Sequence, residues 1–183
     1  MLLWSLARAS GFVAFAAYTG VVVWGILIAG RSFRPAAPAV AFHRLLGALG
    51  MVAIVTHVTA LLLDSYANVT VGSLFGLGPS FAVTLGAIAF WLAIGLPLSF
   101  RLRKAKFISF RLWRKLHWLG YATWVLMLGH GLLNGTDTAS PYAAALYAGS
   151  AGLVATAVVG RRLGATGGAP TAARGRTAPA RAE

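Results

Sequence analysis

The 183-residue sequence has no cysteine and only three acidic residues. The absence of cysteine excludes disulfide bonds, iron–sulfur clusters held by thiolates and covalent haem attachment through a C-x-x-C-H motif. Charged residues make up only 10% of the chain, against about 25% in a typical soluble domain. Because 58% of the residues are hydrophobic, too little charge remains to cover a soluble surface. We therefore expect an integral membrane protein.

Several apolar segments are long enough to cross a bilayer, because about 20 helical residues span its hydrocarbon core. Backbone groups in lipid must form hydrogen bonds within their own segment, which favours helices. The sequence therefore predicts an all-α membrane domain over residues 1–162, a bundle of about five transmembrane helices. The predicted helices cover residues 5–29, 39–63, 80–100, 111–134 and 142–160.

Two other segments differ in composition from the predicted helices. Residues 64–79 mix apolar residues with Gly and Pro, and have room for a short interfacial helix. Residues 163–183 are mostly Gly, Ala, Pro, Thr and Arg without apolar periodicity. That composition predicts a disordered basic tail on the cytoplasmic side.

The formal net charge of +13 is explained by where the basic residues lie. Lys and Arg gather in the first and third connections and after the last helix, whereas the second and fourth connections contain Asp64 and Asp137. The positive-inside rule then places the N-terminus outside and the C-terminus in the cytoplasm. This topology explains the charge better than nucleic-acid binding does. The expected location is the plasma membrane, with several passes and with lipid as a partner.

All four histidines fall within two predicted helices, His43 and His57 in the second and His117 and His130 in the fourth. Ionisable residues inside a membrane are rare and usually functional. Both helices begin on the cytoplasmic side, so they run parallel and form an inner pair (His43, His117) and an outer pair (His57, His130). The helical rise separates the two levels by about 20 Å. Two imidazoles at each level predict two stacked haems, each with its iron bound on both sides.

Fourteen residues, or two heptads, separate His43 from His57, so these side chains share a helix face. Gly47 and Gly50 lie on the same face. These glycines either leave space for flat macrocycles or allow neighbouring helices to pack closely.

The spacing in the fourth predicted helix is less regular. Thirteen residues separate His117 from His130, which rotates the side chain by about 220° on an ideal helix. The two histidines share a face only if the helix bends; otherwise the two haems are approached from different directions. A bend is permitted by the nearby glycines Gly120, Gly129 and Gly131.

The paired spacing and the surrounding sequence resemble the ferric reductase-like transmembrane domain. The similar stretches are FHRLLGALGMVAIVTHVTALLLDSY and WRKLHWLGYATWVLMLGHGLLNGTDT, within a resemblance from Trp4 to about Arg162. The superfamily includes ferric reductases, NADPH oxidases and the haem-binding subunit of a bacterial methionine sulfoxide reductase. The resemblance implies two non-covalent haems b with bis-histidine ligation, and electron flow from a cytoplasmic donor through the inner haem to the outer one.

Two features depart from the family pattern. The family core has six helices, whereas five are predicted here. The large reductases also carry a flavin and nicotinamide domain, but the segment GLGPSF lacks the third glycine of a G-x-G-x-x-G turn. The expected donor is therefore a separate flavin- or FMN-containing redox protein, or a quinol.

Haem propionates are anions that bind arginine or lysine. Arg44 and Arg114 lie at the level of the inner histidines, where the alternative role is that of topology-determining charges. Arg8 is the exception to the charge rule, because it lies near the outer face. It is within reach of an outer propionate, Asp64 or Asp137, or else extends to water. The tryptophans Trp113, Trp118 and Trp124 are expected to be interface anchors, and the less favoured alternative is packing against haem or electron relay.

The favoured function is a di-haem b membrane cytochrome that carries electrons from a cytoplasmic or quinol donor to an external acceptor. Such a chain is an oxidoreductase subunit that needs a separate donor protein. The alternative is a histidine-based proton or metal transporter or channel without haem. No Asp or Glu lies inside a predicted helix, which disfavours proton transport. A third function, as the membrane anchor of a redox complex, is compatible with the same sequence features.

Overall fold

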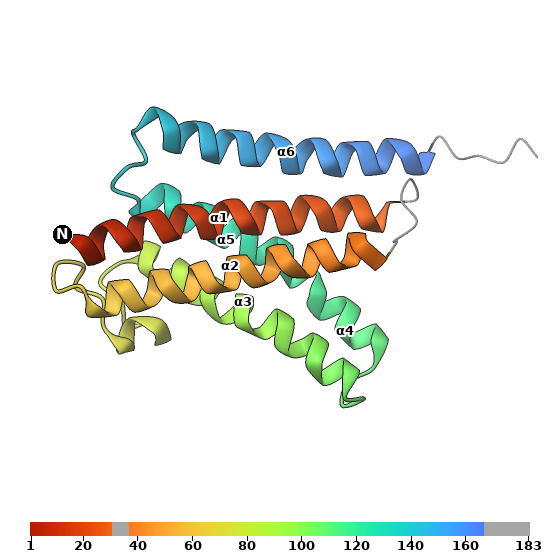
Figure 1. Cartoon of the computed structure of the whole chain (residues 1–183), viewed down its shortest axis with the longest axis horizontal. Helices are drawn as coiled ribbons and strands as arrows, with labels where there is room; N and C mark the ends of the chain where they lie inside the picture. Colours follow the sequence, from red (N-terminus) through yellow and green to blue (C-terminus); the bar gives the residue numbers. More distant parts are fainter. Residues whose placement is uncertain (31–36, 167–183) are drawn as a thin grey trace, which may run out of the picture.

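The computed structural model describes residues 1–30 and 37–166, and this part of the chain contains helices and no strand. Four of the helices are long and apolar enough to cross a membrane, which indicates a multi-pass membrane protein and confirms the all-α prediction (Figure 1). They are α1 (Leu2–Ala29), α2 (Ala37–Leu63), α3 (Phe81–Lys104) and α6 (Pro141–Thr166).

The predicted fourth span, residues 111–134, is divided into two helices, so its prediction as one helix was wrong. Helix α4 covers Phe110–His117 and helix α5 covers Leu119–Asn134. Around Trp118 the backbone tightens, because Trp118 N–H donates to the Lys115 carbonyl and Tyr121 N–H to the Trp118 carbonyl. Such bonds over three residues are those of a 3₁₀ turn. The interruption lies at Trp118 rather than at the glycines expected to permit a bend.

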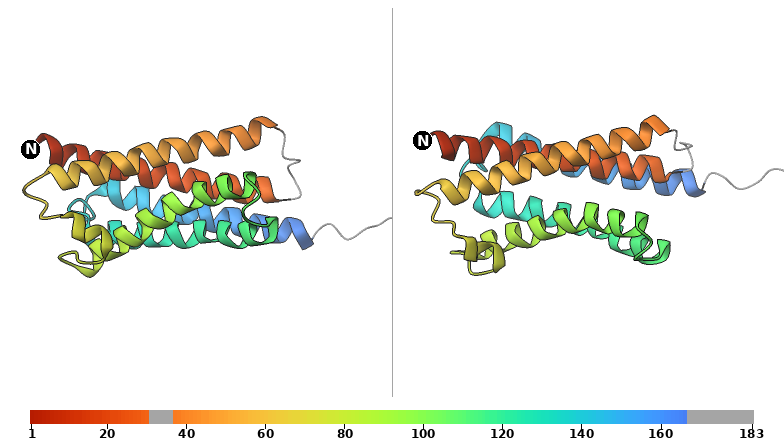
Figure 2. Two further views of the ribbon diagram at one scale, coloured as in Figure 1. Left: turned by 90° about the horizontal axis from the view of Figure 1, so that it is seen from below. Right: turned by 60° about the horizontal axis from the view of Figure 1, so that its bottom comes forward.

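Two groups of helices lie side by side (Figure 2). Helix α1 packs against α2 and α6, and α3 packs against α5 and α4. The two groups meet mainly where α1 contacts α5. Among the helices that the structure describes, α2 and α5 are not a closely packed pair. The two helices that contain most of the predicted ligands are therefore held in place by other helices.

Aromatic side chains fill the core between α1, α5 and α6. Phe15 contacts Trp124 and Tyr147, with ring centroids 6.2 and 5.3 Å apart. The indole Nε1 of Trp124 donates to Thr19 Oγ1 over 2.9 Å. Trp124 is buried in this core, so its predicted role as an interface anchor was wrong. Its hydrogen bond satisfies a polar atom that has no access to water.

The outer surface of the bundle is apolar. Val52, Val125 and Leu153 are 66%, 58% and 59% exposed. Large apolar side chains that point outward from several helices suit a lipid environment, since water would disfavour a patch of this extent.

The connection from α2 to α3 contains a short 3₁₀ helix, η1 (Val71–Phe75), which agrees with the expected short helix in this segment. It lies at the end of the bundle where α1 begins (Figure 1). The indole of Trp91 in α3 donates to the Leu74 carbonyl over 2.7 Å and fixes η1 to the bundle. Asp64 begins this connection and accepts hydrogen bonds from the backbone amides of Tyr66 and Ala67.

Helix α6 continues to Thr166, beyond the predicted domain boundary at residue 162. The remainder of the predicted tail, residues 167–183, lies outside the described residues, as do Arg31 and Arg34 of the first connection.

Candidate functional site

The structure brings the four histidines together in two pairs, one at each level. The ring centroids of His43 and His117 are 6.2 Å apart, with an angle of 61° between the ring planes. Those of His57 and His130 are 6.3 Å apart, at 81°. Each pair joins α2 to the α4–α5 segment, across the space where these helices are not closely packed.

Both histidines of the α4–α5 segment lie against histidines of α2, although the spacing between them is not that of one helix face. His117 is the last residue of α4, and His130 lies near the end of α5. A continuous ideal helix would turn these side chains about 220° apart. In the structure the helix is interrupted between the two residues, and each imidazole meets a histidine of α2.

The outer pair is positioned by carbonyl groups of neighbouring helices. His57 Nδ1 lies 2.7 Å from the Ala7 carbonyl of α1, and His130 Nδ1 lies 2.8 Å from the Ala82 carbonyl of α3. A carbonyl can only accept, so each Nδ1 carries the proton and donates it. Nε2, on the other side of each ring, then keeps a free lone pair. A metal-binding histidine usually has this arrangement.

A cavity of about 510 Å³ adjoins the outer histidines. Its walls include His57, His130 and Arg8, together with mainly apolar side chains of α1, α2, α3 and α5. Cofactor pockets commonly measure about 300–1,000 Å³ and have apolar walls with a few polar groups. The outer site therefore has both the donor atoms and the space for a large flat ligand.

The inner pair is less enclosed. His43 Nδ1 is buried and faces the Val21 carbonyl without the geometry of a hydrogen bond. His117 is exposed at the end of α4 and stacks on Trp113, with centroids 5.2 Å apart and ring planes at 29°. Trp113, expected to be an interface anchor, is thus part of the surroundings of the inner pair. Trp118 is 60% exposed, as an anchor would be.

The two glycines between His43 and His57 have different surroundings. A Cβ atom built on Gly50 would lie 3.6 Å from Ala17 Cβ, in ordinary contact with α1. A Cβ atom on Gly47 would have no neighbour within 4 Å. Gly50 therefore serves helix packing, whereas Gly47 borders open space on the histidine face.

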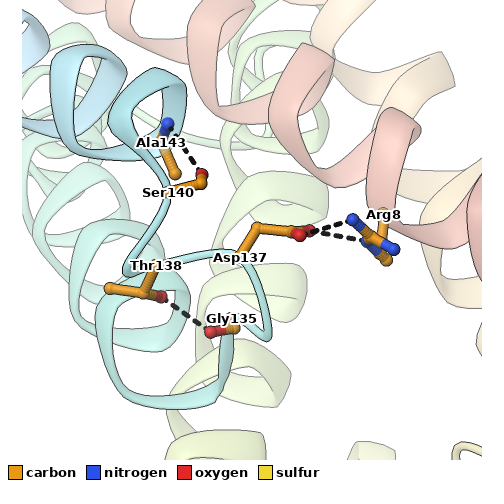
Figure 3. A network of polar contacts seen from close by, with 6 residues as sticks. All are labelled: Arg8, Gly135, Asp137, Thr138, Ser140 and Ala143. Atoms are coloured by element: carbon orange, nitrogen blue, oxygen red, sulfur yellow. Dashed lines mark hydrogen bonds and ion pairs between the residues drawn. The ribbon is translucent and has the colours of Figure 1, made fainter.

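Arg8 pairs with Asp137 rather than with Asp64. Its guanidinium donates through Nε to Asp137 Oδ2 over 2.6 Å and through a terminal nitrogen to Oδ1 (Figure 3). This bidentate pair joins α1 to the connection between α5 and α6. Both residues also border the outer cavity, so Arg8 lies close enough to the outer site to face a cofactor's acidic group.

Arg44 and Arg114 lie beside the inner histidines in the sequence and are exposed. Neither forms an ion pair within the part of the chain that the structure describes. Arg114 lies over the Phe110 ring, with its guanidinium carbon 5.9 Å from the centroid. Both arginines are free to meet an anion at the inner level.

Protein side chains alone do not complete a metal site at either level. Within residues 1–30 and 37–166, no group of three or more His, Cys, Asp or Glu residues lies together. A structural zinc site needs four protein ligands and a catalytic one usually three. Two opposed imidazoles suit instead an iron whose other ligands come from a porphyrin, so the residues present fit haem.

Three glycines that border the histidines were not predicted. Gly11, Gly25 and Gly86 face His57, His43 and His130, respectively. A signal was present for two of them, because Gly11 and Gly25 are as far apart in the sequence as His43 and His57. Because α1 and α2 are antiparallel, this equal spacing places Gly11 opposite His57 and Gly25 opposite His43.

Comparisons with protein-family models, with curated proteins and with solved structures find no match to this chain.

Proposed function

We propose that the chain is a di-haem b membrane cytochrome of the ferric reductase-like type. His43 and His117 hold the inner haem, and His57 and His130 hold the outer haem. Bound haem supplies a reversible one-electron change at iron. With two such centres at different depths, the chain carries electrons from a cytoplasmic or quinol donor to an acceptor outside.

The separation of the imidazole rings is the observation that carries this proposal. An imidazole nitrogen binds a transition metal at about 2 Å and lies about 1.1 Å from its ring centroid, so opposed imidazoles on one metal have centroids about 6.2 Å apart. The measured separations are 6.2 and 6.3 Å. These separations support one metal between the two rings of each pair, at the two levels where the sequence predicts haem.

The same separation disfavours a proton relay between the histidines. Two rings joined by a direct hydrogen bond of about 2.9 Å would have centroids about 5.1 Å apart. The outer imidazoles instead direct their Nδ1 atoms toward helix carbonyls. The transporter alternative therefore lacks the contact between donor and acceptor that it needs.

Each level has arginine side chains suited to bind the propionate groups of a haem. Arg8 borders the outer cavity, and Arg44 and Arg114 lie exposed near the inner pair. In the proposed topology the N-terminus is outside and the α4–α5 segment completes a fifth crossing of the plasma membrane. The basic residues of the α3–α4 connection then face the cytoplasm, where a separate flavin-containing donor would bind.

The test is a spectrum of the purified protein, before and after reduction with dithionite. We expect six-coordinate haem b at two haems per chain. His57→Ala and His130→Ala should each remove the outer haem and leave the inner one. His43→Ala and His117→Ala should do the reverse.

The matched control is Thr56→Ala, which alters the residue next to His57 and should keep both haems. A colourless protein from cells supplied with haem would refute the proposal. So would four histidine variants that all retain the full haem content.

A further inference from the structure

Three of the four histidines face the same small motif on a neighbouring helix. The motif is a backbone carbonyl followed four residues later by a glycine, and we name it a carbonyl–glycine seat. His57 faces Ala7 and Gly11, and His130 faces Ala82 and Gly86. The third seat, Val21 and Gly25, faces His43.

The spacing within each seat follows from helix geometry. In a helix the carbonyl of residue i accepts from the amide of residue i+4, and its second lone pair remains available. A side chain at i+4 leans toward the helix N-terminus and covers this carbonyl. A glycine at i+4 leaves the carbonyl open to an imidazole from another helix.

The rings lie directly against the glycines. A Cβ atom built on Gly86 would lie 2.7 Å from His130 Nδ1, and one built on Gly11 would lie 3.0 Å from His57 Nδ1. A Cβ atom on Gly25 would lie 3.3 Å from His43 Cε1. Alanine at the first two positions would therefore push the ring away from the carbonyl that receives its Nδ1 proton.

The register of the helices explains why the motif recurs. Fourteen residues separate Ala7 from Val21 on α1, and fourteen separate His43 from His57 on the antiparallel α2. Thirteen residues separate His117 from His130, and the residue thirteen positions after Gly86 is Ser99 rather than glycine. His117 stacks on Trp113 instead.

We infer that the seats are positioning devices for the proposed haem ligands, and that Gly11, Gly25 and Gly86 are the residues that make them possible. This inference rests on the proposed function. The two formed seats, at His57 and His130, hold the imidazole with the proton on Nδ1 and strengthen the donor power of Nε2, as a second hydrogen-bonded partner does for a metal-binding histidine. The outer haem has two formed seats and is held more tightly than the inner one.

The experiment compares Gly86→Ala and Gly11→Ala with two control variants in the same helices. Gly95→Ala adds a Cβ with no neighbour within 4 Å, and Gly20→Ala adds one in ordinary contact, 3.5 Å from a Leu46 methyl. The measurements are haem content per chain, the midpoint potential of each haem and the rate of haem transfer to apomyoglobin.

We expect Gly86→Ala and Gly11→Ala to release the outer haem about 10- to 100-fold faster, the range for loss of a partner of a metal ligand. Outer haem that stays bound should have a higher midpoint potential, because a less basic ligand stabilises ferric iron less. Gly25→Ala should affect the inner haem only, and more weakly. Both control variants should match the unaltered protein.

Unchanged release and potentials in Gly86→Ala and Gly11→Ala would overturn the inference, as would equal losses in the two control variants. Loss of both haems with aggregation in Gly86→Ala and Gly11→Ala would also contradict it, because the seats at these glycines act on the outer level alone. In each case the unaltered protein would still contain two haems. Failure of the proposed function would instead appear as an unaltered protein without haem.

Discussion

Trp124 joins two helices through a single polar atom inside the bundle. Replacing it with Phe removes the hydrogen bond from Nε1 to Thr19 Oγ1 and part of the ring volume. Thr19 keeps its own bond to the Phe15 carbonyl, so no unpaired donor remains there. We expect Trp124→Phe to lower the free energy of unfolding in detergent by about 1–2 kcal/mol. Trp118→Phe, at an exposed position, should change it by less than half as much.

Asp137 is the acidic partner of Arg8 at the end of the bundle near the outer histidines. Asp137→Asn removes the charge and the bidentate geometry, which give such pairs their strength. We expect a lower thermal midpoint by fluorescence-detected size-exclusion chromatography. The double variant Arg8→Gln/Asp137→Asn should lose less stability than the two single variants added together, because both changes break the same ion pair.

Asp64→Asn provides the comparison for Asp137→Asn. Asp64 accepts the amides of Tyr66 and Ala67, and an asparagine side chain can form the same turn. A loss of stability in Asp64→Asn equal to that in Asp137→Asn would show that the ion pair has no special role.

Single-residue features were predictable where chemistry alone makes a residue unusual. The four histidines and Arg8 are of types that are rare in apolar helices, so the sequence singles them out, and the structure brings the histidines together in the two expected pairs. Gly11, Gly25 and Gly86 are three of 22 glycines, and nothing in their type separates them from the others. Their role depends on which helix faces them, and that is a property of the packing.

At the scale of helices, the rotation of α4 relative to α5 sets the direction of His117 relative to His130. Insertion of one alanine between Trp118 and Leu119 would rotate α4 by about 100° relative to α5. We expect this variant to lose the inner haem and keep the outer one, because His130 stays in register with α2 and α3. Haem content and the reduced spectrum measure this outcome.

An alanine inserted after Thr136, in the connection between α5 and α6, is the matched control. It changes no register between the ligand helices, so both haems should remain. Retention of two haems after the insertion at Trp118 would mean that α4 does not orient an iron ligand.

The helix boundaries show which parts of the architecture composition predicts. The ends of α1, α2, α3 and α6 lie close to the ends of long apolar segments, which the sequence displays directly. Composition does not predict the break at Trp118, because no proline adjoins this residue. The backbone angles of Trp118 are themselves helical. The break is defined by hydrogen bonds that span three residues instead of four around Trp118. The sequence analysis expected a bend at the glycines instead.

For the whole molecule, the absence of cysteine offers a direct test of the proposed topology. We expect Thr136→Cys, in an exposed connection on the outer side, to react with a membrane-impermeant maleimide in intact cells. Ala105→Cys, exposed in the basic connection after α3, should react only after the membrane is permeabilised. The opposite pattern would reverse the orientation and place the outer histidines on the cytoplasmic side.

Helix α2 packs mainly on α1 and helix α5 mainly on α3, so α2 and α5 are not closely packed against each other. Helix α2 also contacts α3 only sparsely. The outer cavity has walls on α2, α3 and α5, so part of its boundary lies where these helices contact one another sparsely. For the proposed haem, we expect entry into this cavity laterally from the bilayer after the chain has been inserted, without unfolding of the helices. Apoprotein already assembled in vesicles should then take up cofactor dissolved in lipid, and loading becomes a late step of biogenesis.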